Sequence, residues 1–211
     1  MIERLKFCLS LLLLFYTSNV FADQYALVAN NAQPLSNKVC VTCHGGAGVG
    51  NPVVGAPSLA GLESWYLRNQ LIGFRANFRG AQAQYIPAYE MQDSVAKLSD
   101  SEIDQLVAYI SAWEPVSSAP TFSGDTNHGS EIYASCAACH GIFAEGNELL
   151  NAPALASRDD WYLLRQLKLF KSGFRGSHPD DQFGAQMRAS VQVLETEQDM
   201  TDVVAYIKSL Q

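Results

Sequence analysis

A five-residue pattern occurs twice in this chain, 96 residues apart. Residues 40–44 read CVTCH and residues 136–140 read CAACH, so each copy has two cysteines three positions apart and a histidine directly after them. One short motif can arise by chance, but two copies at a fixed offset indicate that the surrounding sequence is duplicated as well. Such a duplication constrains the fold, because both copies must then form the same kind of unit.

The similarity between the two copies extends well beyond the cysteines. A shift of the chain by 96 residues brings many identical residues into register. The matching pairs are Ala56-Pro57 and Ala152-Pro153; Trp65-Tyr66-Leu67 and Trp161-Tyr162-Leu163; Gln70-Leu71 and Gln166-Leu167; Phe74 and Phe170; Gly80 and Gly176; and Met91 and Met187. After one extra residue in the second copy, Val107-Ala108-Tyr109-Ile110 coincides with Val204-Ala205-Tyr206-Ile207. Repetition over roughly 75 residues at one offset predicts two copies of one domain.

The repeated motif has a specific chemistry. C-x-x-C-H is the attachment pattern of c-type haem, in which both thiols add to the haem vinyl groups and the histidine ligates the iron. The sequence therefore predicts two covalently bound haem c groups. The predicted attachment residues are Cys40, Cys43, Cys136 and Cys139, and the predicted iron ligands are His44 and His140.

Two other uses of these four cysteines are open. An exported protein can form disulfides, for which four cysteines allow three pairings, and cysteine–histidine sets can also bind zinc. A thioredoxin-like redox motif is disfavoured, because no βαβ pattern accompanies either pair. Neither disulfides nor zinc accounts for the remainder of the repeat.

The methionines support the haem interpretation. Met91 follows His44 by 47 residues, and Met187 follows His140 by the same 47 residues. Methionine usually fills gaps in a core, but this shared distance predicts that both side chains are the second axial ligands. Thioether ligation opposite imidazole raises the reduction potential, as in cytochromes c. Met200 lies on an apolar helical stripe and is expected in the core.

The apolar periodicity predicts helices only. Ser99–Glu102 is a capping box before the stripe Ile103, Leu106, Val107 and Ile110, and residues 196–207 repeat this pattern with Asp199 in place of glutamate. Segments 63–75, 159–172 and 130–139 also have helical spacing, the last running into the second motif, and the glycine-rich stretches after each motif are expected to be loops. The predicted fold class is all-α, with two tandem domains that each wrap around one covalently bound haem.

The N-terminus has the features of a secretory signal peptide. Arg4 and Lys6 precede an apolar run of residues 7–16, and Val20 and Ala22 place small residues before a cut at Asp23. That run is well short of the ~20 residues of a spanning helix, although an uncleaved membrane anchor is an alternative. We expect a periplasmic protein with peripheral or no membrane association.

The expected domain organisation follows from these segments. It comprises a signal peptide over residues 1–22, an N-terminal domain over 23–113, a Pro- and Ser-containing linker over 114–125 and a C-terminal domain over 126–211. Cleavage would change the net charge from −7 to −8. This acidity argues against a nucleic-acid partner, because phosphate binding requires Lys and Arg.

Together these residues resemble the dihaem class I cytochromes c of the cytochrome c-four family. The resemblance implies two three-helix domains that meet around a pseudo-twofold axis with their haem edges close together. It also implies that the carbonyls of Pro57 and Pro153 accept a hydrogen bond from the ligand histidines, although prolines also simply punctuate loops. The glycine and aromatic pair that packs the first helix on the last is present as Gly129 and Tyr133, whereas the first half has Gln33 and Asn37.

The resemblance further implies an electron carrier with redox protein partners, no catalytic residues and no small-molecule substrate, and thus not an enzyme. The expected donor is a bc-type complex or a dehydrogenase, and the expected acceptor is a terminal oxidase or reductase. The alternative is the dihaem electron-accepting subunit of a periplasmic dehydrogenase such as a flavocytochrome. Five basic residues could neutralise haem propionates but are expected to be solvated: Arg68, Arg75, Arg165, Lys171 and Arg175.

Overall fold

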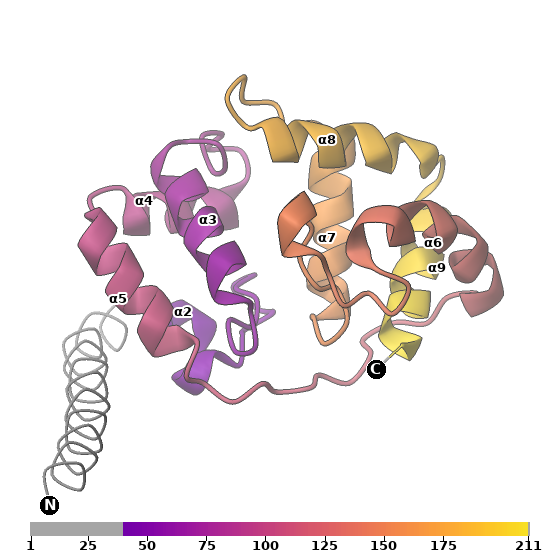
Figure 1. Cartoon of the computed structure of the whole chain (residues 1–211), viewed down its shortest axis with the longest axis horizontal. Coiled ribbons are helices and arrows are strands. Elements are labelled where there is room, and N and C mark those ends of the chain that lie inside the picture. Colours follow the sequence, from indigo (N-terminus) through magenta and orange to yellow (C-terminus); the bar gives the residue numbers. More distant parts are fainter. Residues whose placement is uncertain (1–39, 211) are drawn as a thin grey trace, which may run out of the picture.

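The protein consists of two helical lobes joined by an extended segment (Figure 1). The computed structural model describes residues 40–210, and this part of the chain contains helices and two isolated β-bridges but no sheet. The predicted all-α fold is therefore confirmed. The signal peptide, its cleavage after Ala22, and Gln33 and Asn37 lie outside the described residues.

The first lobe is built from α2 (Val41–His44), η2 (Gly46–Gly48), α3 (Ser64–Arg75), α4 (Ile86–Val95) and α5 (Asp100–Ile110). The capping box predicted at the start of α5 is present. Ser99 Oγ accepts a hydrogen bond from the Glu102 backbone N–H at 3.3 Å, and Glu102 Oε2 accepts one from the Ser99 N–H at 2.8 Å. The apolar stripes of α3 and α5 then form one core, which contains Leu67, Leu71, Phe74, Ile103, Leu106, Val107 and Ile110.

The second lobe repeats this arrangement with α6 (Thr126–His140), η3 (Glu148–Leu150), α7 (Asp160–Lys171), α8 (Gln182–Ser190), η4 (Val191–Val193) and α9 (Glu197–Ser209). The helices predicted over 63–75 and 159–172 are confirmed as α3 and α7. The one predicted over 130–139 is confirmed and begins earlier, because Asp125 caps its N-terminus by accepting hydrogen bonds from the N–H groups of Asn127 and His128.

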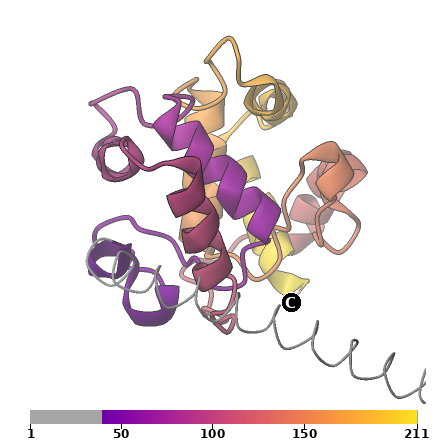
Figure 2. The ribbon, with the colours of Figure 1, turned by 60° about the vertical axis from the view of Figure 1, so that its left-hand side comes forward.

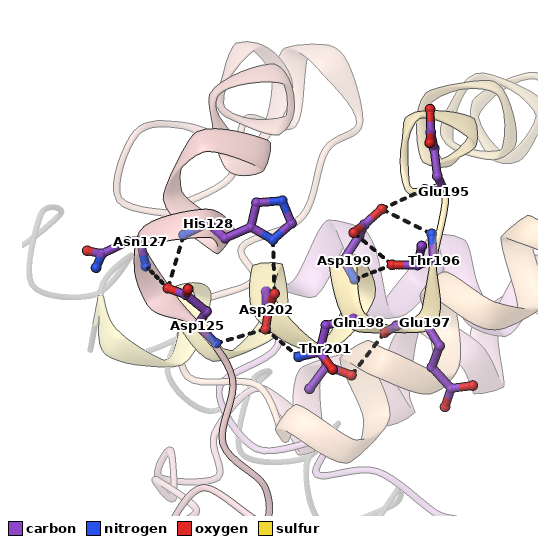
Figure 3. A network of polar contacts seen from close by, with 10 residues as sticks. All are labelled: Asp125, Asn127, His128, Glu195, Thr196, Glu197, Gln198, Asp199, Thr201 and Asp202. Atoms are coloured by element: carbon purple, nitrogen blue, oxygen red, sulfur yellow. Dashed lines mark hydrogen bonds and ion pairs between the residues drawn. The ribbon is translucent and has the colours of Figure 1, made fainter.

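Helices α6 and α9 pack closely in the second lobe. A Cβ atom at Gly129 would lie 2.1 Å from the backbone oxygen of Asp202, so this contact requires a glycine. Tyr133, one turn further on, packs against Tyr206 with ring centroids 5.5 Å apart. The buried carboxylate of Asp202 accepts hydrogen bonds from the Asp125 N–H, from Gln198 and from His128 (Figure 3). The predicted glycine and aromatic pair is thus confirmed in the second half.

Helices α4 and α8, which carry Met91 and Met187, were not predicted from the sequence. Their apolar residues do not form a buried stripe: only Val95 of α4 is fully buried, and no residue of α8 is. Pro87 near the start of α4 and the Asp181 cap of α8, whose carboxylate accepts from the Gly184 N–H at 2.9 Å, provide the local signals for a helix start.

The segment between the lobes is fastened to the second lobe along its length. The Thr121 backbone N–H and Oγ1 donate to the buried Asp160 carboxylate at 2.5 and 2.9 Å, and Lys208 Nζ donates to the Ser118 carbonyl at 3.2 Å. Figure 2 shows the first lobe in front of the second, and Figure 1 shows this segment running below both lobes from one to the other. Within residues 40–210, no helix is long and apolar enough to cross a membrane.

Candidate functional site

Each cysteine–histidine motif lies at the C-terminal end of a helix. His44 ends α2 and His140 ends α6, and both side chains are buried, with 7% of their surface exposed. The chain then turns into a glycine-rich loop that returns to the histidine. In both loops an isolated bridge, Asn51 with Ala56 and Asn147 with Ala152, brings the following proline next to the imidazole.

The two histidines are held in the same way. Nδ1 of His44 donates to the Pro57 carbonyl at 2.7 Å, and Nδ1 of His140 donates to the Pro153 carbonyl at 2.8 Å. Burial lowers the pKa of both imidazoles, and the proline hydrogen bond only partly offsets this effect. Each ring is therefore neutral at pH 7, with its proton on Nδ1 and a free Nε2 available as a ligand.

The four cysteines are free thiols. Cys40 and Cys136 are partly buried, and burial raises the pKa of both thiols, whereas Cys43 and Cys139 are exposed. Within the described part of the chain no group of three or more His, Cys, Asp or Glu side chains could hold a metal ion. The disulfide and zinc alternatives therefore find no support in the arrangement of residues 40–210.

Both predicted methionine ligands pack on the same core as the first cysteine of their own half. Met91 and Cys40 pack against the core of the first lobe, and Met187 and Cys136 pack against the core of the second. In the first lobe, Met91 lines one cavity together with Cys40, Cys43 and His44. Met200, by contrast, belongs to the core of the second lobe and is 6% exposed, as expected.

The cavity of the first lobe fits a haem c group. Free thiols, an imidazole and a thioether meet there, and apolar side chains of the core form most of the walls: Leu59, Leu67, Leu71, Phe74, Leu106 and Ile110. This is the donor set and the dry surrounding that a covalently held, six-coordinate haem requires. Part of the wall comes from the second lobe, namely from Arg158, Asp159, Tyr162, Arg165 and Gln166.

The lobes contact each other through reciprocal pairs of hydrogen bonds. The Ser58 N–H donates to Asp159 at 3.0 Å, and the Ala154 N–H, at the repeat position of Ser58, donates to Glu63 at 2.8 Å. Asp159 and Glu63 also occupy equivalent positions, 96 residues apart. Such reciprocity is what a pseudo-twofold axis between the lobes produces.

A second reciprocal contact involves two arginines, of which the sequence analysis named Arg175, as a solvated residue, and missed Arg79. Arg79 and Arg175 are both buried at the contact between the lobes, so the expectation that Arg175 is solvated is wrong. Their side chains bind residues of the opposite lobe, because Arg79 donates to Gln166 and Arg175 donates to Gln70. The sequence signal is the triplet Phe-Arg-Gly, which occurs at 78–80 and again at 174–176.

Comparison with known proteins places this chain in a family. The Cytochrome c family model matches twice, over residues 29–113 and 127–211. Among curated proteins, the chain is 33% identical over 165 residues to a thiosulfate dehydrogenase electron acceptor of Stutzerimonas stutzeri, covering 71% of each protein. It is 26% identical over 182 residues to Cytochrome c4 of Azotobacter vinelandii, covering 82% of this chain and 84% of that protein.

A solved structure shows the same fold. The crystal structure of reduced recombinant cytochrome c4 from Pseudomonas stutzeri superimposes with a TM-score of 0.65 at 24% identity, covering 85% of this chain and 98% of that one. Two cytochrome c domains imply two covalent haem c groups, each with an iron, and thus an electron-carrying role. The chain therefore belongs to the cytochrome c family, as a dihaem electron carrier with two tandem domains.

Proposed function

We propose that both haems of this electron carrier are held by the same set of residues in each half. The thioether bonds would form at Cys40 and Cys43 for the first haem and at Cys136 and Cys139 for the second. The axial iron ligands would be His44 with Met91, and His140 with Met187. The domains that carry them would span residues 23–113 and 126–211, joined by the linker 114–125.

The observation that carries this proposal is the shared histidine geometry. In both lobes a proline carbonyl binds the imidazole Nδ1–H, at 2.7 and 2.8 Å, and a methionine packs on the same core as the first cysteine. The proline carbonyls of Pro57 and Pro153 fix the ring orientation and keep Nε2 unprotonated. An iron held by histidine and methionine cycles between the ferric and ferrous states at a raised potential.

The protein residues have two tasks in this role. The proline carbonyls orient the ligands, and the apolar core side chains exclude water, which limits the reorganisation that accompanies a change of charge. With both axial positions filled by protein, no position remains for a substrate. We therefore propose a carrier without catalytic residues or a small-molecule substrate, and not an enzyme.

The proposed partners are redox proteins of the periplasm. A bc-type complex or a dehydrogenase would supply electrons, and a terminal oxidase or reductase would accept them. The name of one relative, a thiosulfate dehydrogenase electron acceptor at 33% identity, favours a dehydrogenase over a bc-type complex as the electron donor. In that role the chain would accept electrons directly from a periplasmic dehydrogenase.

Export would follow from the N-terminal sequence. Residues 1–22 have the charge and apolar pattern of a signal peptide with cleavage after Ala22. Haem attachment and a periplasmic location would then go together. N-terminal sequencing of the protein isolated from the periplasm checks this, and a retained Met1 would contradict it.

The first experiment is a spectrum of the purified protein together with a haem count by pyridine haemochrome. Two c-type haems per chain, with the long-wavelength ferric band of methionine ligation from both, are expected. A high-spin spectrum that responds to peroxide or carbon monoxide would mean an open iron and would contradict the carrier function.

A second experiment separates the two candidate partners. Stopped-flow reduction by a purified thiosulfate dehydrogenase is compared with reduction by a bc-type complex. Fast reduction by the dehydrogenase alone would assign the chain as its electron acceptor, and fast reduction by the bc-type complex alone would assign a respiratory carrier.

A further inference from the structure

Two buried arginines lie at the centre of the contact between the lobes. Arg79 and Arg175 occupy equivalent positions of the repeat and are only 8% and 9% exposed. Arg79 follows α3 and Arg175 follows α7, and these two helices, which face each other across the middle of the molecule, carry the hydrogen-bond partners of both arginines (Figure 1). Each guanidinium also packs over a phenylalanine ring of its own lobe, at 4.3 Å for Phe74 and 4.4 Å for Phe170.

The two guanidinium groups share their acceptors. Gln70 Oε1 accepts from Arg79 at 2.5 Å and from Arg175 at 2.9 Å, and Gln166 Oε1 accepts from them at 3.1 and 2.8 Å. Two like charges therefore lie within two hydrogen-bond lengths of each other. Tyr162 and Tyr66 complete the set by accepting from Arg79 and Arg175, respectively.

Gln70 and Gln166 are uncharged amides, whereas the pKa of Tyr162 is lowered, because the charges of Arg79 and Arg175 outweigh the opposing effect of its burial. Within residues 40–210 no carboxylate forms an ion pair with either guanidinium, and Asp181 acts on Arg175 only from beyond ion-pair distance. Burial lowers the pKa of Arg79, and the charge of Arg175 lowers it further. Arginine nevertheless stays charged in proteins, so this pair is a buried dication that requires an anion.

The haem cavity of the first lobe reaches one member of this pair, Arg79. Its wall includes Arg79 with both shared acceptors, Gln70 and Gln166. The same wall contains Arg158, whose Nε atom is buried without a hydrogen-bond partner among the described residues. Two guanidinium groups on the wall of a haem cavity, one of them with an unpartnered N–H, match the two carboxylates that a haem carries on one edge.

The geometry points to Arg79 and Arg175 as one shared carboxylate-binding site that holds a propionate from each haem, so that each arginine serves both lobes. This inference rests on the proposed function, because it takes the two haem positions from it. The acceptors Gln70 and Gln166 then align the guanidinium groups, and haem attachment completes the contact between the lobes by supplying the missing negative charge.

The test is a redox titration of the holoprotein carrying Arg79→Gln or Arg175→Gln. The two haems are followed separately by proton NMR of the two ligand methionine methyls. Either single substitution is expected to lower both potentials, because a lost positive charge favours the ferric state. The expected change is roughly tenfold in the ferrous-to-ferric ratio at fixed potential, or about 59 mV for one electron. A response of only one haem, or of neither, would overturn the shared site.

Matched variants isolate the charge. Arg79→Lys keeps the positive charge, so both reduction potentials should stay close to those of the wild type. Arg68→Gln removes an exposed arginine that pairs with Asp104 and should change neither potential. Haem count and methionine ligation are measured in every sample. If the wild type lacks two methionine-ligated haems, the proposed function fails. If it has them and substitution of Arg79 or Arg175 leaves the potentials unchanged, only the shared site fails.

The wild-type protein provides an independent measurement that needs no variant. Carboxylates held by two guanidinium groups stay ionised, so both potentials should be constant between about pH 5 and pH 8. A proton-linked drift of either potential across this range would show a propionate that titrates freely and would overturn the site.

Discussion

The loop after each haem motif has the same backbone hydrogen bonds in the two lobes, but side chains of different size pack around it. The Gly48 carbonyl accepts from the N–H groups of Leu59 and Ala60 at 2.8 and 3.3 Å. The Ala144 carbonyl accepts from the equivalent residues of the second lobe at 2.8 and 3.1 Å. Both residues have a positive φ, 64° and 57°. The hydrogen-bond pattern of this loop is thus preserved between the copies.

The volumes around this loop are distributed differently. A Cβ atom at Gly48 would lie 2.4 Å from the ring of Trp113, whereas the second lobe holds a Cβ at the equivalent position, in the fully buried Ala144. The residue equivalent to Trp113 is Leu210, which packs on the core of the second lobe. A small residue therefore faces a large one in the first lobe, and both are of intermediate size in the second. The comparison shows that the backbone hydrogen bonds were retained while the side chains around them changed.

The largest expected effect comes from the methionines and tests whether the lobes act as separate haem units. Met91→Leu and Met187→Leu keep the volume but remove the thioether, so each should abolish about half of the long-wavelength ferric band and lower one potential. Met200→Leu is the matched control and should leave the band unchanged. Loss of the whole band from one substitution would contradict independent ligation.

The next effect is confined to the second lobe, where α6 and α9 are in close contact. Gly129→Ala places a methyl group against the Asp202 backbone and should destabilise this lobe by about 3 kcal/mol. Ser130→Ala, at the neighbouring exposed position, is the control. Hydrogen exchange of the α6 and α9 amides should rise strongly in the glycine variant, while α3 and α5 should change little. Equal changes in both lobes would mean that they unfold together.

A double-mutant cycle compares the residue pair Gly48 and Trp113 of the first lobe with the equivalent pair Ala144 and Leu210 of the second. Gly48→Ala should destabilise the first lobe by roughly 2 kcal/mol through its clash with Trp113. Adding Trp113→Leu makes this site resemble Ala144 and Leu210, so the double variant should be more stable than the sum of the single effects predicts. Chemical unfolding of all four proteins provides the measurement, and strict additivity would show that the two residues do not compensate each other.

The smallest effect is a pH dependence that only the second lobe should have. The hydrogen bond to Asp202 raises the pKa of His128 above its unfolded value (Figure 3). The folded state therefore binds the proton more tightly. This stabilisation is complete below the unfolded pKa of about 6.5 and is lost as the pH rises through the folded pKa. The position equivalent to Asp202 in the first lobe is Gln105, which carries no charge.

Unfolding followed at several pH values, with His128→Gln as the comparison, measures this effect. The wild-type second lobe should lose stability relative to the variant as the pH rises above about 6.5. A pH dependence of the same size in His128→Gln would assign it to another group.

Much of this molecule could be predicted from its sequence, because each informative motif occurs in both copies of the repeat and one copy supports the interpretation of the other. The motif, the Met91 and Met187 spacing and the capping boxes each appear in both copies, and the all-α fold is confirmed. Helices α4 and α8 were missed because they bury almost no apolar stripe. The family resemblance implied a pseudo-twofold contact between the lobes, but the residues that form it were missed, because a shift of 96 residues shows which positions are equivalent but not which positions touch. Arg175 alone is typical of a surface residue, and only its contacts with the opposite lobe show otherwise.

The reciprocal hydrogen bonds of Ser58 with Asp159 and of Ala154 with Glu63 have a consequence for assembly. A surface that meets its own copy in this way is the kind through which two identical chains form a symmetric dimer. Because the two copies are joined by a short linker that is itself fastened through Thr121 to Asp160, their association does not depend on protein concentration. Dilution in the cell therefore cannot separate the two redox centres. Because the copies are encoded separately, the sequence of one can also change without the other: the position of Leu62 in the first copy is occupied by Arg158 in the second.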